Sequence, residues 1–523
     1  MISAYTGTQV RAAEEPFLAA GLGDVLMRRA AHGLAAGIVT ELRGRGSRLY
    51  GARVAVLTGK GNNGGDGLYA AAFLAARGTR TTAILTSDGA HTDALAAFER
   101  AGGRVYRLAP ETLPELAAEA AGADVVIDAM LGTGARGGLR GNAAELVTAL
   151  AGANRRGFVA ACDLPSGVDA DTGEAAGPVL PADLTVTFGA AKAGLLADPG
   201  ADYAGRVQVV PIGIEEHLPG PSVRRLEPAD LGTLLPRPAR RAHKYSRGVL
   251  GVVAGSADYP GAAVLACRGA LSAGAGMVRY LGPPAVADLV RQSCPEVVCS
   301  TGSVAGNRVQ AWLVGSGMGP GDHEQLARAR DAVASGLPVV ADAGALPALP
   351  DVLAPQVVLT PHAGELAALL TRLGADTGRD GVEAGTLAAV RRAAGLTEAT
   401  VLLKGATTLV ASPFQDVYSQ SDGTPWLATA GSGDVLAGVI GALLAQAGSD
   451  VGRFREAGID PDERWAAIAA LGASLHGLAG RSATEACSGG PITAGVIADA
   501  IPDAWGKVSM LSSFGVAEQH RGA

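Results

Sequence analysis

Short, continuously apolar runs alternate with helical stretches along most of this chain, and this alternation constrains its fold more than any other feature. Strands that are apolar at every position are buried on both faces, as in a parallel sheet covered by helices. Closely spaced prolines at 218–222 and 235–238 separate two such series. We therefore expect two tandem α/β domains, with a proline-rich linker and the entry to the second domain at 216–240. The expected strands are 53–58, 82–85, 124–128, 158–162, 184–188 and 207–210, followed by 249–254, 277–281, 311–314, 338–341, 357–359 and 401–403.

The composition agrees with this architecture and excludes several classes of protein. The 523 residues are enough for two or three complete cores, and a hydrophobic share of 48% excludes a disordered or collagen-like chain. The net charge of −7 gives no overall attraction to nucleic acid or to an anionic membrane. We expect neither as a partner, and a site for a phosphorylated ligand then needs local basic side chains or backbone donors.

The cysteines and the apolar segments indicate a cytoplasmic protein. The five cysteines are odd in number and form neither a CxxC pair nor a zinc-binding spacing, which favours buried thiols in a reducing compartment. Residues 1–20 lack the apolar core of a signal peptide. The longest apolar run, 435–444, is too short to span a bilayer and contains glycine.

The stretch Gly431-Ser432-Gly433-Asp434 precedes an apolar segment that predicts a helix from Val435 onward. The first amides of a helix have no internal partners, so such a start binds anions. A carboxylate there is costly beside a phosphate, unless it takes the proton from a hydroxyl that attacks the phosphate. The pattern resembles the signature of ribokinase-like phosphoryl transfer. The alternative is a glycine-rich turn in which Asp434 only caps the helix.

A second glycine-rich loop lies in the first half, where 59–68 reads Gly-Lys-Gly-Asn-Asn-Gly-Gly-Asp-Gly-Leu after an expected strand. The segment satisfies GxGxxG, and Asp88 follows at the distance of a ribose-binding acid, which alone weakly favours a dinucleotide fold. Asn62, Asn63 and Asp66 argue against that reading, because a dinucleotide-binding loop keeps small apolar residues where the pyrophosphate approaches.

Polar side chains also follow two further strands of the first half. Asp128 ends one strand and is followed by a glycine loop containing Arg136, and Asp163 and Ser166 follow the next. The carboxyl ends of parallel strands share one crevice, so Asn63, Asp128 and Ser166 are candidate oxygen ligands for a cation. The alternative for each residue is ordinary capping of the next helix.

Three ordered segments, 59–68, 128–134 and 163–169, resemble the NAD(P)H-hydrate epimerase domain, a Rossmann-like three-layer α/β/α fold. The resemblance covers residues 1–215 and implies potassium binding by Asn63, Asp128 and Ser166. The chain departs from the family at Met27-Arg-Arg-Ala-Ala, where Met-Glu-x-Ala-Gly is usual. The residues implied to contact the hydrated nucleotide are Asn62, Asn63, Gly64, Gly65, Asp66, Gly132, Thr133, Gly134, Ala135, Arg136, Gly137, Gly138 and Asp163.

Five ordered segments within 225–505 resemble the ADP-dependent hydrate dehydratase of ribokinase-like fold: 243–248, 259–266, 315–319, 359–366 and 403–408. Ser316 replaces a family proline, and Gly344 replaces a family aspartate, which shifts the expected magnesium or water contacts to Asp342 or Glu365. The resemblance implies hydrate contacts at Ala262, Gly317, His362 and Asp434, and nucleotide contacts at Lys404, Gly405, Ala406, Thr407, Thr408 and Gly433. Outside its motif, His362 has the alternative of a core or capping histidine.

Together the two resemblances imply a bifunctional enzyme that repairs hydrated NADH and NADPH (NADHX and NADPHX). The first domain would interconvert the R and S hydrates, with Asp163 moving a proton, and the second would dehydrate the S form using ADP and magnesium, with Asp434 as the base. We expect a homo-oligomer. Two alternatives remain at this point: a ribokinase-like small-molecule kinase with a regulatory domain, and a first half that only binds nucleotides. The choices between NADHX and NADPHX and between ADP and ATP stay open.

Overall fold

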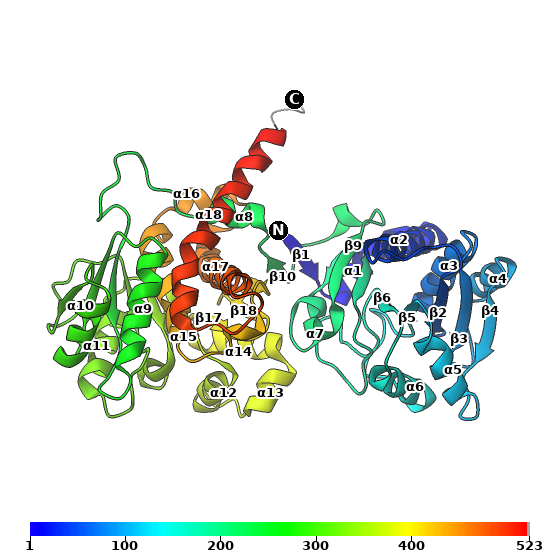
Figure 1. Cartoon of the computed structure of the whole chain (residues 1–523), viewed down its shortest axis with the longest axis horizontal. Helices are drawn as coiled ribbons and strands as arrows, with labels where there is room; N and C mark the ends of the chain where they lie inside the picture. Colours follow the sequence, from blue (N-terminus) through cyan, green and yellow to red (C-terminus); the bar gives the residue numbers. More distant parts are fainter. Residues whose placement is uncertain (520–523) are drawn as a thin grey trace. The chain divides into compact units, whose positions relative to one another are not determined.

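The computed structural model describes residues 1–519, with side chains up to residue 510, and divides them into two compact units (Figure 1). The N-terminal unit comprises Ser3–Val223. The C-terminal unit comprises the described residues from Arg224 onward together with Met1–Ile2. Among the described residues, no helix is both long and apolar enough to cross a membrane.

The N-terminal unit is built around a seven-stranded sheet in which every neighbouring pair of strands is parallel. All six strands expected from its sequence form within a residue or two of the predicted bounds. The additional strand β4 was missed because it is short and mostly exposed, and so lacks an apolar run. The order is β4 (Arg104–Arg107), β3 (Arg80–Leu85), β2 (Arg53–Thr58), β5 (Val125–Ala129), β6 (Phe158–Cys162), β7 (Leu184–Phe188) and β9 (Arg206–Val210).

Helices cover both faces of this sheet, which confirms the three-layer α/β/α fold. Val54 and Val56 of β2 pack in one core with α1 to α4, whereas Ala55 and Leu57 of the same strand pack in another with α5 and α6. Alternate side chains of a strand point to opposite faces, so both must be apolar. The helices are α1 (Gly7–Ala19), α2 (Gly23–Gly44), α3 (Asn62–Ala75), α4 (Thr92–Arg100), α5 (Leu113–Ala121), α6 (Gly141–Gly152) and the short α7 (Gly200–Ala204).

A short parallel pair of strands in the N-terminal unit lies outside its seven-stranded sheet. Strand β1 (Ile2–Tyr5) runs beside β8 (Ala191–Lys192), with Ala4 opposite Ala191 and Tyr5 opposite Lys192. The pairing fixes the backbone at Lys192, a residue whose side chain is almost wholly buried.

The sheet of the C-terminal unit is parallel from β13 to β17 and then turns antiparallel through β18 and β19, with β10 parallel to β19. The antiparallel end departs from the wholly parallel sheet expected from the sequence. The order is β13 (Val298–Ser300), β12 (Met277–Leu281), β11 (Val249–Val253), β14 (Ala311–Val314), β15 (Val339–Ala341), β16 (Val357–Leu359), β17 (Thr400–Leu403), β18 (Thr408–Ala411), β19 (Val417–Gln420) and β10 (Val223–Arg225).

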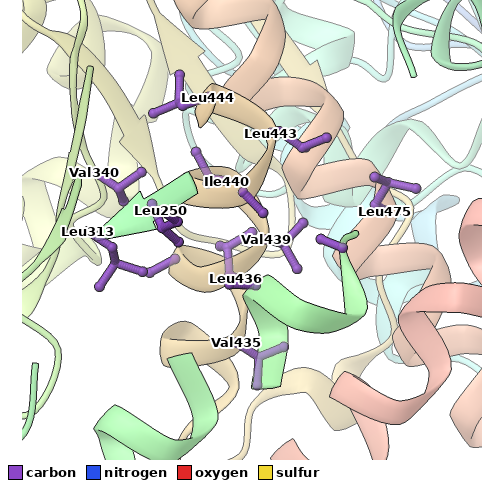
Figure 2. Packing of buried hydrophobic residues seen from close by; sticks show 14 of the residues in the cluster. Leu250, Leu313, Val340, Val435, Leu436, Val439, Ile440, Leu443, Leu444 and Leu475 are labelled. Carbon is purple, nitrogen blue, oxygen red and sulfur yellow. The ribbon is translucent and has the colours of Figure 1, made fainter. Parts of the chain in front are cut away.

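Helix α15 (Ser432–Ala447) is the central helix of this unit and is buried along almost its whole length. Figure 2 shows its side chains beside those of Leu250 and Leu313 from β11 and β14, and beside Leu475 from α17. Helix α9 also packs against it closely: an added Cβ at Gly438 would lie 2.2 Å from the carbonyl oxygen of Ala266. The other helices are α9 (Pro260–Ser272), α10 (Pro284–Ser293), α11 (His323–Ala334), α12 (Ala363–Arg372), α13 (Arg379–Ala384), α14 (Thr386–Thr397), α16 (Val451–Glu456), α17 (Arg464–Ala486) and α18 (Ala494–Gln519).

The proline-rich stretch 216–240 contains regular structure as well as turns. Strand β10 crosses its middle, and α8 (Pro228–Leu234) follows with Pro228 in its first turn, a position that tolerates proline. Leu231 and Leu234 of α8 are buried in the core of the C-terminal unit. The second half of the stretch is therefore part of the C-terminal unit.

Candidate functional sites

The glycine-rich loop after β2 packs against the loop after β5 at distances that exclude side chains. A Cβ at Gly59 would lie 2.0 Å from the carbonyl oxygen of Met130, and one at Gly64 would lie 2.1 Å from the carbonyl oxygen of Gly59. Asn63, in the first turn of α3, lies against Gly132, whose added Cβ would be 2.9 Å from its side chain. The two loops predicted to bind the nucleotide therefore lie side by side.

The structure joins two of the three candidate cation ligands directly. The hydroxyl of Ser166 donates to Asp128 Oδ1 at 2.5 Å, and its backbone N–H donates to Oδ2 at 2.8 Å. Ser166 Oγ also accepts from Leu131, the neighbour of Gly132 against which Asn63 lies. Asp128 is fully buried, and among the described residues it forms no ion pair.

One observation at this point fits a bound monovalent cation. Burial raises the pKa of Asp128, although hydrogen bonds from Ser166 and Met130 oppose this, and no described cationic side chain compensates the carboxylate. The side-chain amide nitrogen of Asn63 is buried without a hydrogen-bond partner, but because it is a donor, only the amide oxygen of Asn63 could bind a cation. Oxygen ligands with one formal charge suit a large, weakly charged ion better than a transition metal.

Asp163, the predicted proton carrier, follows β6 in the left-handed region with a φ of 68°. This conformation is uncommon for residues other than glycine, and it is frequent at functional sites. The ammonium of Lys192 donates to Oδ1 at 2.5 Å, and Thr187 Oγ1 donates to the same atom at 3.1 Å. Oδ2 instead faces Thr133 of the 132–138 loop, whose hydroxyl and N–H both donate to it.

The environment of Asp163 keeps it ionised. Burial would raise its pKa, but the charge and hydrogen bond of Lys192, with further donors from Thr133 and Phe188, together hold the pKa below its usual range. Lys192 uses its ammonium fully, because it also donates to Thr187 Oγ1 and to the carbonyl oxygen of Phe188.

Sequence reasoning missed Lys192 and Glu14, which both lie close enough to Asp163 to interact with its charge. Lys192 stands alone in the otherwise apolar run 190–197, and a lysine in such a run is seldom buried without an acidic partner. That signal was available. Glu14 lies on α1, far from every glycine loop in the sequence, and carried no comparable signal.

A cavity of about 140 Å³ lies beside the 132–138 loop. The predicted contact residues Gly132, Ala135 and Gly137 line it, whereas Arg136 is exposed. The remaining lining residues are Leu131, Gly167, Val168, Asp169, Glu174 and Ala176.

In the C-terminal unit, Asp434 lies in the first turn of α15, after Gly431 in the left-handed conformation at φ 87°. The helix begins at Ser432 and not at Val435 as predicted, so the small residues of the loop contribute the first helical amides. Burial, followed by the negative charge of Asp342, raises the pKa of Asp434 to about 6. The neighbouring hydroxyl of Ser316 and the charge of Lys404 oppose the shift.

Lys404 is the cation of this site. Its Nζ lies 2.9 Å from Asp342 Oδ1 and 3.8 Å from Glu365 Oε2, and these two carboxylates raise its pKa against the effect of burial. A Cβ at Gly433 would lie 3.6 Å from the same Nζ, which places the ammonium beside the start of α15. Of the other predicted nucleotide contacts, Gly405, Ala406 and Thr407 lie in the turn from β17 to β18, and Thr408 is the first residue of β18.

The two departures from the family motifs differ in their structural effect. Ser316 donates to Asp342 Oδ2 at 3.1 Å, so the residue that replaces proline joins the carboxylate network. Gly344 has no room for a side chain, because an added Cβ would lie 2.0 Å from the carbonyl oxygen of Met318. Asp342 and Glu365 are the carboxylates that form ion pairs with Lys404.

Two of the predicted hydrate contacts are adjacent, since a Cβ at Gly317 would lie 2.5 Å from that of Ala262. His362 caps α12: its Nδ1 accepts from the N–H groups of Gly364 and Glu365, and Glu365 accepts from its N–H in return. His362 is therefore a capping residue, as in the alternative reading of the sequence. Its side chain is also 59% exposed, which leaves it accessible to a ligand.

Comparisons with known proteins agree with the family resemblance of each half of the chain. Residues 23–194 match the family described as YjeF-related protein N-terminus, and residues 250–502 match NAD(P)H-hydrate dehydratase. A bifunctional NAD(P)H-hydrate repair enzyme of Mycobacterium tuberculosis (strain CDC 1551 / Oshkosh) is 44% identical over 449 residues, covering 84% of this chain and 89% of that protein. Its counterpart in Mycobacterium leprae (strain TN) is 42% identical over 450 residues, with the same coverage.

Among solved structures, the ADP/ATP-dependent NAD(P)H-hydrate dehydratase of Bacillus subtilis is 26% identical, with a TM-score of 0.47, and covers 55% of this chain and 99% of that one. The two family matches follow each other in the order of the two units, and the full-length relatives are matched over most of their length. The chain belongs to the family of bifunctional NAD(P)H-hydrate repair enzymes.

Proposed function

We propose that the two units share the repair of hydrated NADH and NADPH. The N-terminal unit, as domain 1–215, interconverts the R and S hydrates. The C-terminal unit, as domain 225–505, dehydrates the S hydrate with ADP and releases AMP and phosphate. The observation that carries this proposal is Asp434, a half-buried carboxylate with a pKa of about 6 at the start of α15. That pairing of an anion-binding helix start with a base suits phosphoryl transfer to a hydroxyl.

Dehydration needs a better leaving group than hydroxide. Asp434 removes the proton of the hydrate hydroxyl, whose oxygen then bonds to the terminal phosphorus of ADP while the bond to AMP breaks. The first amides of α15 and the Lys404 ammonium stabilise the transferring phosphoryl group. The lone pair of the ring nitrogen then expels phosphate by cleavage of the C–O bond, and loss of a ring proton restores the dihydropyridine.

We propose hydrate contacts at Ala262, Gly317 and His362, and contacts to the adenine nucleotide from 404–408 and Gly433. Magnesium usually keeps several waters and binds through one or two carboxylates together with substrate phosphates. Asp342 and Glu365 fit this role. No described group of three or more His, Cys, Asp or Glu side chains offers a metal site made of protein ligands alone. The ion would neutralise charge on the phosphates of the nucleotide.

In the N-terminal unit, we propose that residues 62–66, residues 132–138 and Asp163 hold the hydrate. Asn63, Asp128 and Ser166 would hold potassium, for which the uncompensated carboxylate of Asp128 is the supporting observation. The ion would add positive charge beside the anionic nucleotide.

The deciding assay incubates the purified chain with mixed R and S hydrate and ADP. Complete recovery of reduced-nicotinamide absorbance, with one AMP and one phosphate formed per NAD(P)H, supports both activities. Recovery that stops when the S form is exhausted shows that the N-terminal unit does not epimerise. A stable phosphorylated product without recovery of absorbance identifies a small-molecule kinase instead.

A further inference from the structure

Two buried carboxylates near the predicted hydrate site of the N-terminal unit have opposite hydrogen-bonding environments. Asp163 receives donors on both oxygens, from Lys192 and Thr187 on Oδ1 and from Thr133 on Oδ2. Asp66, in α3, is 9% exposed, and its buried Oδ1 has no hydrogen-bond partner. Ionising a buried carboxyl group is costly when one of its oxygens accepts no hydrogen bond, whereas a carboxylate that accepts hydrogen bonds on both oxygens is stable as the anion.

We propose that Asp66 and Asp163 are the acid and the base of epimerisation, and that Lys192 is the positioning residue that keeps them different. This inference rests on the proposed epimerase activity of the N-terminal unit. The pKa values agree with it: burial, followed by the charges of Asp163 and Glu14, raises the pKa of Asp66 well above its usual value, whereas the pKa of Asp163 is lowered. Pairs of carboxyl groups separated in this way divide acid and base roles in other enzymes.

Lys192 acts through Asp163 and not on the hydrate, because its ammonium is enclosed. Its three donors are used by Asp163, Thr187 and the carbonyl oxygen of Phe188, and its side chain is 2% exposed. With Oδ1 held by Lys192, Oδ2 is the oxygen of Asp163 that faces the 132–138 loop through Thr133. Oδ2 is therefore the atom that accepts the proton.

The hydrate carbon is bonded to both the ring nitrogen and a hydroxyl. Asp66 donates its proton to the hydroxyl, the C–O bond breaks with its electrons on oxygen, and the nitrogen lone pair forms the C=N bond of an iminium ion. The released water then adds to the opposite face, the π electrons return to nitrogen, and Asp163 takes the surplus proton. The proton returns from Asp163 to Asp66 through solvent, and the net change is inversion at one carbon.

Other charged or titratable groups contribute to the electrostatics around the pair, and they belong to several elements. Glu14 and Arg11 lie on α1, and Cys162 and Asp128 lie on β6 and β5. The Lys192 ammonium is the cation that lowers the pKa of Asp163. Its removal should therefore have an effect that these other groups do not reproduce.

The test measures R/S interconversion against pH for the full chain and for Lys192→Met, Lys192→Arg and Asp66→Asn. Lys507→Met, an exposed site in the other unit, is the matched control for the lysine substitution. In Lys192→Met the acid limb of the profile should move up by about 1 to 3 pH units, the usual effect of an adjacent opposite charge. Lys192→Arg should reverse part of this shift, and Asp66→Asn should slow epimerisation by a factor of about 10² to 10⁴.

A second readout needs no substrate. NMR titration of ¹³C-labelled aspartate carboxyls, with Asp163 assigned by Asp163→Asn, should show the Asp163 midpoint moving upward in Lys192→Met. Thr187→Val, which removes one donor from the same oxygen, should shift it less in the same direction if Lys192→Met does not fold. If Lys192→Met slows the reaction but leaves the pH–rate profile and the Asp163 midpoint unmoved, Lys192 is merely structural. Full activity of Asp66→Asn would exclude Asp66 as the acid. A wild-type chain without epimerase activity would contradict the proposed function, while the titration would still decide the role of Lys192.

Discussion

Ser432 Oγ and His476 Nε2 lie 3.2 Å apart, and both side chains are buried. Ser432 is the first residue of α15, and His476 lies in α17, so the contact connects the start of the proposed phosphate-binding helix to a neighbouring helix. Burial lowers the pKa of His476 to about 4, and the imidazole is therefore neutral near pH 7. The Ser432–His476 contact therefore holds the first turn of α15, which contains Asp434, and changes of pH in the physiological range do not alter it.

Replacing His476 with Phe should weaken dehydration without moving its pH profile. The variant leaves the buried hydroxyl of Ser432 without this partner, which costs about 1 to 3 kcal/mol. Thermal unfolding and the KM for ADP measure the effect. The double variant Ser432→Ala/His476→Phe removes both partners and should recover much of the loss; equal loss in single and double variants would show that the contact is unimportant.

Asp434→Asn should lower the rate of dehydration by a factor of about 10² to 10⁴, as expected when a catalytic base is removed. R/S interconversion, which we assign to the other unit, should continue at the wild-type rate. Recovery of NAD(P)H from pure S hydrate measures the first activity, and chromatographic separation of the epimers measures the second. Asp376→Asn, at an exposed position of the same unit, is the control; near-normal dehydration by Asp434→Asn would reduce this residue to a helix cap.

The pH dependence of dehydration should report the ionisation of Asp434. A base must be deprotonated to act, so the rate should be highest above a pH of about 6 and fall as the pH decreases through that value. Ser316→Ala removes a neighbouring hydroxyl that lowers the pKa of Asp434, and the acid midpoint should move to higher pH. Single-turnover rates across this range test the idea, and an unmoved midpoint would mean that another group controls the acid limb.

Asp128→Asn should weaken potassium binding and slow epimerisation, because it removes the one formal charge among the three proposed ligands. By analogy with other metal sites, the potassium concentration for half-maximal rate should rise by about tenfold or more. ADP-dependent dehydration of pure S hydrate is the internal control. Epimerisation that is equally fast in tetramethylammonium, and insensitive to the substitution, would exclude the cation site.

Gly269→Val should destabilise the C-terminal unit selectively. A Cβ at Gly269 of α9 would lie 2.5 Å from the carbonyl oxygen of Val435, within the first turns of α15. Forcing the two helices apart should cost about 1 to 3 kcal/mol, as is usual for overpacking. The thermal transition of this unit should fall, dehydration should fall with it, and epimerisation should be unaffected. Gly261→Val, on the same helix but with open space around its Cβ, is the matched control.

Much of the fold was predictable because buried parallel strands consist of continuous apolar residues, which are visible in the sequence. Every strand expected in that way formed. The antiparallel hairpin of β18 and β19 was missed: 408–411 and 417–420 each contain only four residues, separated by a short turn. Segments of this length carry little periodicity, so their pairing is decided by contacts with α17 and β17 and not by local pattern.

The motifs located the glycine loops and the acids next to them, since such loops must approach a ligand closely. They did not show which acid is charged. Asp66 and Asp163 look alike in the sequence, and only the fold brings Lys192 to one of them and leaves an oxygen of the other without a donor. Nor could a motif tell that position 344 lacks space for any side chain, because the limiting atom is the carbonyl oxygen of Met318.

The left-handed backbone of Asp163 also limits how this position can vary. Aspartate, asparagine and glycine adopt that conformation readily, whereas branched and bulky residues do so only with strain. Most mutations at residue 163 would therefore lower the abundance of the folded protein as well as its activity. Descendants of this gene that abandon epimerisation would be expected to keep Asp, Asn or Gly here, so an inactive unit could persist for a long time with an almost unaltered site.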